Sequence, residues 1–129
     1  MEIPLRTALL AWLAADPVLA AQLNAIVEEA PSRTALPWLA VAASASADWS
    51  AKDLPGREVR IALELHCRGD QPGAAADLTS AIETQIAALP PDQPGLRVVN
   101  ITFLRARAEA RAANTRAILL EYRFRVLAA

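Results

Sequence analysis

The C-terminal part of the chain alternates between apolar and polar residues in two stretches, Leu96–Leu104 and Arg116–Val126. A period of two residues is typical of strands that bury one face. An arginine-rich connector, Arg105–Thr115, separates the two stretches. We therefore predict a long β-hairpin with a charged, solvent-exposed tip. On its first strand, the residues expected to face the core are Val99, Ile101 and Phe103.

The clearest strand elsewhere is Arg57–Cys67, in which every second residue from Val59 onward is apolar. A shorter strand is predicted at Pro37–Ala43 and a brief one at Ala25–Val27. The segments between them are polar and rich in turn-forming residues, which favours loops. These predicted loops are Glu28–Ala35 and the longer Ser44–Gly56.

Two segments carry apolar residues at helical spacing. The first begins near Pro4 and aligns Leu5, Leu9, Trp12 and Leu13 on one face. Asp16 can cap a short second helix that starts at Pro17, because proline is tolerated at the first helical position. Gly69–Gly73 breaks the preceding strand, and Asp70 or Gln71 can cap a further helix that is predicted to run to about Leu89. Its apolar stripe consists of Leu78, Ile82, Ile86 and Leu89.

These elements predict an α+β fold, because helices and strands occupy separate parts of the chain and each has one apolar face to cover. We expect a two-layer sandwich: an antiparallel β-sheet with the helices packed on one face, closed by the long C-terminal β-hairpin. The chain has 129 residues, which is the usual size of one domain, so residues 1–129 are predicted to form a single domain.

Charge is segregated along the chain although the formal net charge is only −1. Residues 97–129 contain seven arginines and two glutamates, a net charge of +5, whereas residues 1–96 contain six basic and twelve acidic side chains, a net charge of −6. Such a polar molecule is suited to head-to-tail contacts between copies, in which unlike surfaces meet. A solvated basic strand face is the simpler interpretation.

The residues that usually carry chemistry are sparse. His66 and Cys67 are the only histidine and cysteine, and as neighbours on a strand they point to opposite faces. They cannot form a nucleophile pair or a His/Cys zinc site within one chain. Cys67 is expected to be a buried small hydrophobe, and His66 to be solvated or at an interface. We assign no catalytic, cofactor-binding or metal-binding residue, and no apolar run is long enough to span a membrane.

Candidate interface residues remain in two places. Arg105, Arg107, Arg111 and Arg116 could contact nucleic-acid phosphates, but no stacking platform of aromatic residues accompanies them. Acidic protein surfaces are the better partners, because the rest of the same chain is acidic. Trp49 and Lys52 lie in a predicted polar loop. There a tryptophan either packs back onto its own core or anchors an interface.

The order of segments resembles the tail-terminator, or tail-completion, family of long-tailed phages and of phage-derived particles such as gene transfer agents. The resemblance covers nearly the whole chain and lies in the order and spacing of its pieces. These are an N-terminal helix closing on Ala14-Ala15-Asp16-Pro17, then Ala35-Leu36-Pro37-Trp38-Leu39-Ala40-Val41, then Asp48-Trp49-Ser50-Ala51-Lys52, the strand Glu58–Gly69, an alanine-rich helix, Arg97-Val98-Val99-Asn100-Ile101-Thr102-Phe103, and the closing Arg116–Leu127.

The resemblance implies an α/β sandwich and a structural protein without catalytic residues. Family members are usually homohexameric rings that cap the head-proximal end of the tail tube and join it to the head connector. The implied partners are other copies of the chain, the major tail tube protein, a connector or stopper, and duplex DNA that passes through the ring without specific binding. The implied location is the bacterial cytoplasm during assembly and the particle afterwards.

Two other functions stay open at this stage. The same residues could serve another head–tail connector component, such as a stopper or adaptor. A DNA-binding module is a further alternative, which a steep salt dependence of duplex affinity would reveal. A small enzyme that uses sites shared between subunits is the remaining class.

Overall fold

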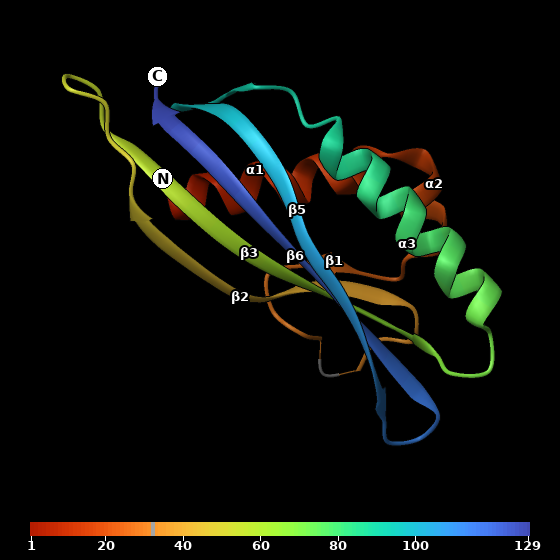
Figure 1. Cartoon of the computed structure of the whole chain (residues 1–129). Helices are drawn as coiled ribbons and strands as arrows, with labels where there is room; N and C mark the ends of the chain where they lie inside the picture. Colours follow the sequence, from red (N-terminus) through yellow and green to blue (C-terminus); the bar gives the residue numbers. More distant parts are fainter. Residues whose placement is uncertain (32) are drawn as a thin grey trace.

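The computed structural model describes residues 1–31 and 33–129. This part of the chain forms three helices and a curled sheet of six strands, so the predicted mixed α+β fold is confirmed (Figure 1). Ser32, within the predicted loop at Glu28–Ala35, lies outside the described residues. In chain order the elements are α1 (Glu2–Ala15), α2 (Pro17–Gln22), β1 (Ile26–Val27), β2 (Trp38–Asp48), β3 (Gly56–Arg68), α3 (Pro72–Ala87), β4 (Asp92–Gln93), β5 (Leu96–Arg111) and β6 (Thr115–Ala128).

The strands are hydrogen-bonded in the order β1-β2-β3-β6-β5-β4, which puts the last strand of the chain at the centre of the sheet. The pairs β2–β3, β3–β6, β5–β6 and β4–β5 are antiparallel. The expectation of an entirely antiparallel sheet is wrong at one edge, where β1 runs parallel to β2. Parallel neighbours need a crossover rather than a tight turn, and the segment between Val27 and Trp38 supplies it.

The helices begin where the sequence provides the right residues. Asp16 caps α2 by accepting a hydrogen bond from the Leu19 N–H at 3.1 Å, as predicted. Gln71, one of the two predicted capping residues, is at the N-cap of α3, although its side chain makes no capping hydrogen bond. Pro72 occupies the first turn, where a proline needs no hydrogen-bond acceptor. None of these helices is both long and apolar enough to cross a membrane.

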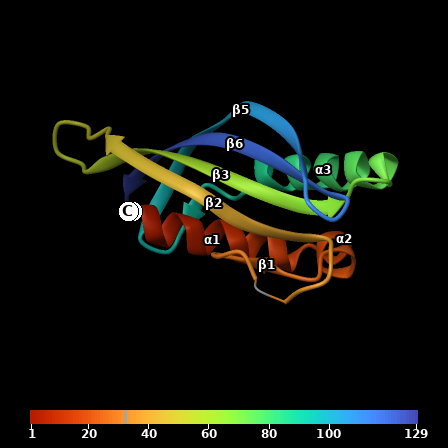
Figure 2. The same cartoon turned by 90° about the horizontal axis from the view of Figure 1, so that it is seen from below.

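The core lies between the helices and one face of the sheet (Figure 2). The predicted strand register is confirmed on β3, where the alternate apolar residues are buried, and Leu63 is fully inaccessible. The helical stripes are confirmed as well, with Leu5, Leu9 and Ile82 inaccessible. The opposite face of the sheet carries no helix in Figure 2. We call it the open face.

The connector between the two C-terminal strands is much shorter than predicted. β5 continues to Arg111 and β6 starts at Thr115, so only Ala112–Asn114 form the turn. Ala113 and Asn114 have φ values of 57° and 55°, a left-handed conformation that allows the sharp reversal. The segment from Arg105 to Arg111 is therefore strand rather than flexible tip. Its alternation of charged residues with alanines is the period-two signal that indicates this.

The predicted loop at Ser44–Gly56 is also mostly strand. β2 runs on to Asp48 and pairs with β3 as far as Arg57, which leaves only residues 49–55 as a loop. The alternating Ala and Ser residues of this segment have the period of a strand, but they lack the bulky apolar side chains on which the prediction depends.

Register shifts in β5 change which of its residues face the core. The pairing with β6 shifts between Val98 and Asn100 and again between Phe103 and Arg105. As a result Val98 is buried, whereas Val99 is 44% exposed. Ile101 and Phe103 pair with the buried Phe124 and Tyr122 and so lie on the predicted face, although Phe103 remains 45% exposed. The prediction that Val99 faces the core is wrong, because a bulge inserts one unpaired residue and inverts the alternation.

Candidate interaction surfaces

The open face carries a lattice of charged side chains from β3, β5 and β6. Arg105 on β5 forms a two-point ion pair with Glu121 on β6, with one Nη2–Oε1 distance of 3.1 Å. Farther along β5, the Nη2 atom of Arg111 lies 2.9 Å from Glu109 and 3.5 Å from Glu64 on β3. The pairs Arg105–Glu121 and Arg111–Glu64 join residues that are far apart in sequence, so these two pairs exist only because the sheet aligns the strands.

The pKa shifts on this surface follow from the pairing. The hydrogen bond from Arg105 lowers the pKa of the Glu121 carboxyl, and the positive charges of Arg105 and Arg107 lower it further. The same hydrogen bond raises the pKa of the Arg105 guanidinium. Both groups therefore stay ionised near neutral pH, and the lattice is a mixed surface of both signs rather than a purely basic one.

The predicted basic group is divided between the two faces of the hairpin. Arg105, Arg107 and Arg111 lie on the open face. Arg116 is paired with Ala110 on β5 and with Cys67 on β3. Because residues directly opposite in a sheet share a face, Arg116 points to the helix side. The structure thus brings three of the four arginines together and separates the fourth.

Trp49 and Lys52 belong to the loop between β2 and β3, which lies at the other end of the sheet from the β5–β6 turn (Figures 1 and 2). Lys52 is exposed, and Trp49 is half-buried. The guanidinium carbon of Arg125 stands 5.6 Å from the centre of the Trp49 ring, within the range of a cation–π contact. Trp49 therefore keeps one part against its own sheet and presents the rest to solvent.

The loop that carries Trp49 and Lys52 is tightly held. The Trp49 N–H donates to the Gly56 carbonyl oxygen at 3.0 Å, and the Gly56 N–H donates to the Ser50 hydroxyl at 3.0 Å. A Cβ atom on Gly56 would lie 2.4 Å from the Trp49 oxygen, so a larger residue cannot occupy this position without moving the loop. This loop is a preformed projection at its end of the sheet.

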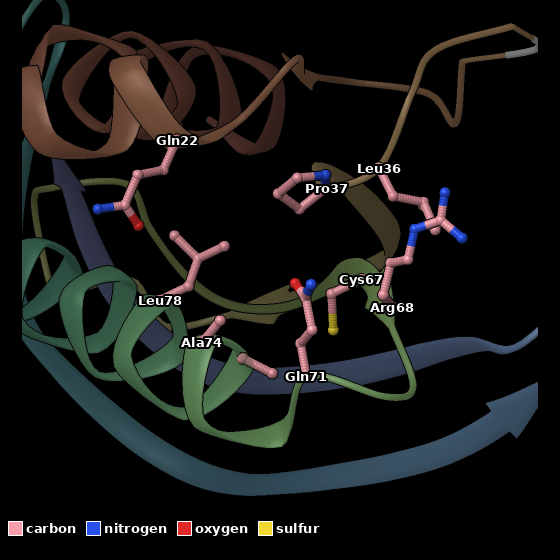
Figure 3. Close-up of a pocket in the computed structure, with 9 residues that line it drawn as sticks. Gln22, Leu36, Pro37, Cys67, Arg68, Gln71, Ala74 and Leu78 are labelled. Carbon is pink, nitrogen blue, oxygen red and sulfur yellow. The ribbon is translucent and has the colours of Figure 1, made fainter.

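A cavity of about 310 Å³ opens between α2, α3 and the end of β3 (Figure 3). Cys67 points into it together with Gln71 and Leu78. Burial raises the pKa of the Cys67 thiol, which therefore stays protonated, as expected of a small buried hydrophobe. No cluster of three or more metal-ligating side chains occurs in residues 1–31 or 33–129.

His66 and Cys67 lie on opposite faces, as predicted. The Cys67 thiol donates to the Arg116 carbonyl oxygen at 3.7 Å. The His66 ring stacks on Trp38 with the ring centres 3.9 Å apart, and its Nε2 atom contacts Glu64. His66 is thus half-buried rather than solvated. Trp38 is buried by this stacking on the open face.

Comparisons with known proteins test the resemblance to tail-completion proteins, which covers nearly the whole chain. The family model for "Tail completion protein gp17" matches residues 7–127. The chain belongs to this family. Family membership assigns the chain a structural role in phage tails, and the resemblance inferred from the order of segments is confirmed.

A solved structure gives an independent comparison of the fold. A chain of the structure titled "Virion of native gene transfer agent (GTA) particle" superimposes with a TM-score of 0.83 and is 24% identical in sequence. The match covers 96% of this chain and 95% of the other, so the two proteins share the whole fold. A search of curated protein sequences gives no match.

Proposed function

We propose that the protein is a ring-forming tail terminator. In this function, six copies form a ring that caps the head-proximal end of a phage-like tail tube and joins it to the head connector. Assembly takes place in the bacterial cytoplasm, and the ring remains in the finished particle. The observation that carries the proposal is the match of the tail-completion family over residues 7–127.

The arrangement of the candidate residues supports two separate axial contacts. The loop with Trp49 and Lys52 and the turn of the β5–β6 hairpin project from opposite ends of one sheet. A terminator needs one contact region for the tube and another for the head connector. We assign these two regions to the loop and to the arginine-bearing hairpin.

We place the open face on the wall of the central channel. Its paired charges support a channel through which DNA passes without specific binding. Glutamates on the same face pair with Arg105, Arg107 and Arg111, and Arg125 lies 3.3 Å from Glu58. Paired arginines release few counterions on contact with phosphates. We therefore expect weak duplex binding with a shallow dependence on salt concentration. A steep dependence would favour the DNA-binding alternative.

Particles assembled without this protein provide the main test. Purified protein added to such preparations should bind at one end of each tail tube, limit tube length and restore joining to heads, as seen by electron microscopy. The protein should form a closed ring with a channel about 20 Å wide, the width of duplex DNA. A protein found one layer toward the head, without contact to tube subunits, would instead be a stopper. A protein that stays monomeric and binds no tail would contradict both functions.

A further inference from the structure

The sheet has two outer edges that are largely bare within the described residues. At one edge β1 pairs only with Leu39 and Ala40 of β2, so the edge is open from Val41 to Asp48. At the other edge β4 pairs only with Leu96 and Arg97 of β5, so the edge is open from Val99 to Arg111. Bare edges carry unpaired N–H and C=O groups and are templates for pairing with another chain.

The far part of β5 is exposed on both faces as well as at its edge. Every residue from Phe103 to Arg111 is exposed except Glu109, which is half-buried. Val99, Phe103 and Leu104 on this strand are three of the six large apolar residues that are exposed in the described part of the chain. A strand this long with so little cover is suited to a partner that buries it.

The open edge of β2 lacks the usual protection against pairing. From Ala42 to Ala47 it contains only alanine and serine, with no charge and no proline. Its register shift lies between Val41 and Ala43, which leaves Ala43–Asp48 as a regular stretch. The regular stretch beyond the second shift of β5 is Arg105–Arg111. The two stretches have nearly equal length.

The two edges are complementary in side-chain size. On the open face, β2 presents the small side chains of Ala43, Ala45 and Ala47, and β5 presents the long charged side chains of Arg105, Arg107, Glu109 and Arg111. On the helix side, Ala106, Ala108 and Ala110 of β5 would meet Ser44, Ser46 and Asp48. Large side chains on one edge would therefore lie over small ones on the other, which lets the backbones approach closely.

Both edges carry charges of both signs. Next to the β2 edge, on β3, Glu58 lies opposite Ala47 and Arg60 lies opposite Ala45. The β5 edge carries Glu109 as well as Arg105, Arg107 and Arg111. In an antiparallel register with Ser46 opposite Ala108, Arg107 would lie beside Glu58, and Glu109 beside Arg60. Unlike charges of the two edges would then meet, which favours this contact.

We propose that Arg105–Arg111 of one copy pairs in antiparallel fashion with Ala43–Asp48 of the next copy, so that the sheet continues from subunit to subunit around the ring. The occupant of each edge is a second copy of this chain, and the proposal rests on the ring inferred above.

The symmetry of a ring fixes the relative direction of the two strands. Rotation about the ring axis leaves the component of each strand's direction along that axis unchanged. β5 and β2 are antiparallel within a chain, and they therefore stay antiparallel across the junction. The two stretches lie at opposite ends of the sheet, so pairing them displaces each sheet along its strands relative to the next. The strands are then tilted against the ring axis, as closure of a barrel requires.

The proposal can be tested at a backbone N–H group of β2 that points away from β3. The Trp49 N–H points inward to Gly56, and alternate residues of an antiparallel strand point the same way. Ala47 and Ala45 therefore face β3, and the Ser46 N–H faces outward to the proposed partner. Ser46→Pro removes this outward donor without breaking the β2–β3 ladder. Ser46→Ala is the matched control, because it keeps the N–H and loses only the hydroxyl that Arg57 contacts at 3.3 Å.

Sedimentation velocity and native mass spectrometry of the full-length chain report the outcome. The wild type and Ser46→Ala should form the same ring, and Ser46→Pro should lose it and remain a folded monomer by circular dichroism. Rings of Ser46→Pro with unchanged association would overturn the edge-pairing proposal and leave the terminator function standing. A wild type that forms no ring, even on tail tubes, would overturn both.

Cross-linking keeps the proposal testable if Ser46→Pro fails to fold. In a Cys67→Ala background, Ser46→Cys combined with Ala108→Cys should give a ladder of covalent oligomers on oxidation, because directly opposed residues lie within disulfide distance. The control pair combines Ser46→Cys with Ala87→Cys, which places the second thiol at the exposed end of α3. Ladders of equal yield from the two pairs, or no ladder from the first pair in assembled rings, would overturn the proposal.

Discussion

The two strands of the β5–β6 hairpin have similar lengths and opposite environments. β6 lies between β3 and β5 and buries Ala117, Leu120, Phe124 and Val126 to 0% exposure. β5 buries only Leu96 and Val98, and the rest of the strand is half-buried or exposed. Position in the sheet, rather than composition of the hairpin, decides which strand contributes to folding and which is available for contacts. Four predictions test this contrast, in order of decreasing effect on the free energy of unfolding.

Phe124→Ala should have the largest effect. The side chain is fully buried on β6, and its removal leaves a cavity in the centre of the core. We expect a loss of about 3–5 kcal/mol in the free energy of unfolding, measured by urea denaturation. Leu104→Ala on β5 is the control, because Leu104 is 37% exposed and should cost far less. Equal losses at the two positions would contradict the contrast between the strands.

Tyr122 should make stability depend on alkaline pH. Burial, and to a smaller extent the charge of Glu83, raises its pKa from 10.0 to about 12. Below pH 10 the phenol is protonated in both states, so its contribution is complete. As pH rises from 10 towards 12, only the unfolded chain releases the proton, and stability falls. Tyr122 is the only tyrosine, so the absorbance of its phenolate can be followed directly. Tyr122→Phe should remove this part of the pH dependence.

Replacing Arg105, Arg107 and Arg111 together with alanine should impair assembly and leave the monomer folded. These side chains are exposed on β5, and exposed ion pairs contribute little to stability. The unfolding midpoint should therefore shift slightly, and binding to tails should be lost. Arg33→Ala is the control, because Arg33 is exposed and lies outside the helices and strands. A triple variant that is unfolded would show that the lattice holds the sheet together.

Ala113→Gly should have the smallest effect, and a stabilising one. Ala113 has a φ of 57°, where a Cβ atom is unfavourable by about 1–2 kcal/mol. Part of the gain is offset because glycine gives the unfolded chain more freedom. We expect a gain of up to about 1 kcal/mol in thermal or urea unfolding. A loss of stability would mean that the turn has another conformation in solution.

Parts of the candidate surface were predictable from the sequence. The abundance of arginine between residues 105 and 116 is visible directly, and so is the separation of His66 from Cys67 on a strand. The partners were not predictable. Glu64 and Arg111 are distant in the chain, and only the order β3-β6-β5 brings them within 3.5 Å. The division of Arg116 from the other arginines depends equally on strand register.

The sequence by itself determined the elements whose apolar residues repeat with a clear period. These are the buried face of β3, the stripes of α1 and α3, and the capped start of α2 at Asp16. In each case, the signal is local, because burial of one face requires that periodicity. Tertiary structure decided the rest: where β2 and β5 end, which residues of β5 are displaced by bulges, and how the charges pair. Those features depend on alignment between strands that are remote in sequence, which no local pattern encodes.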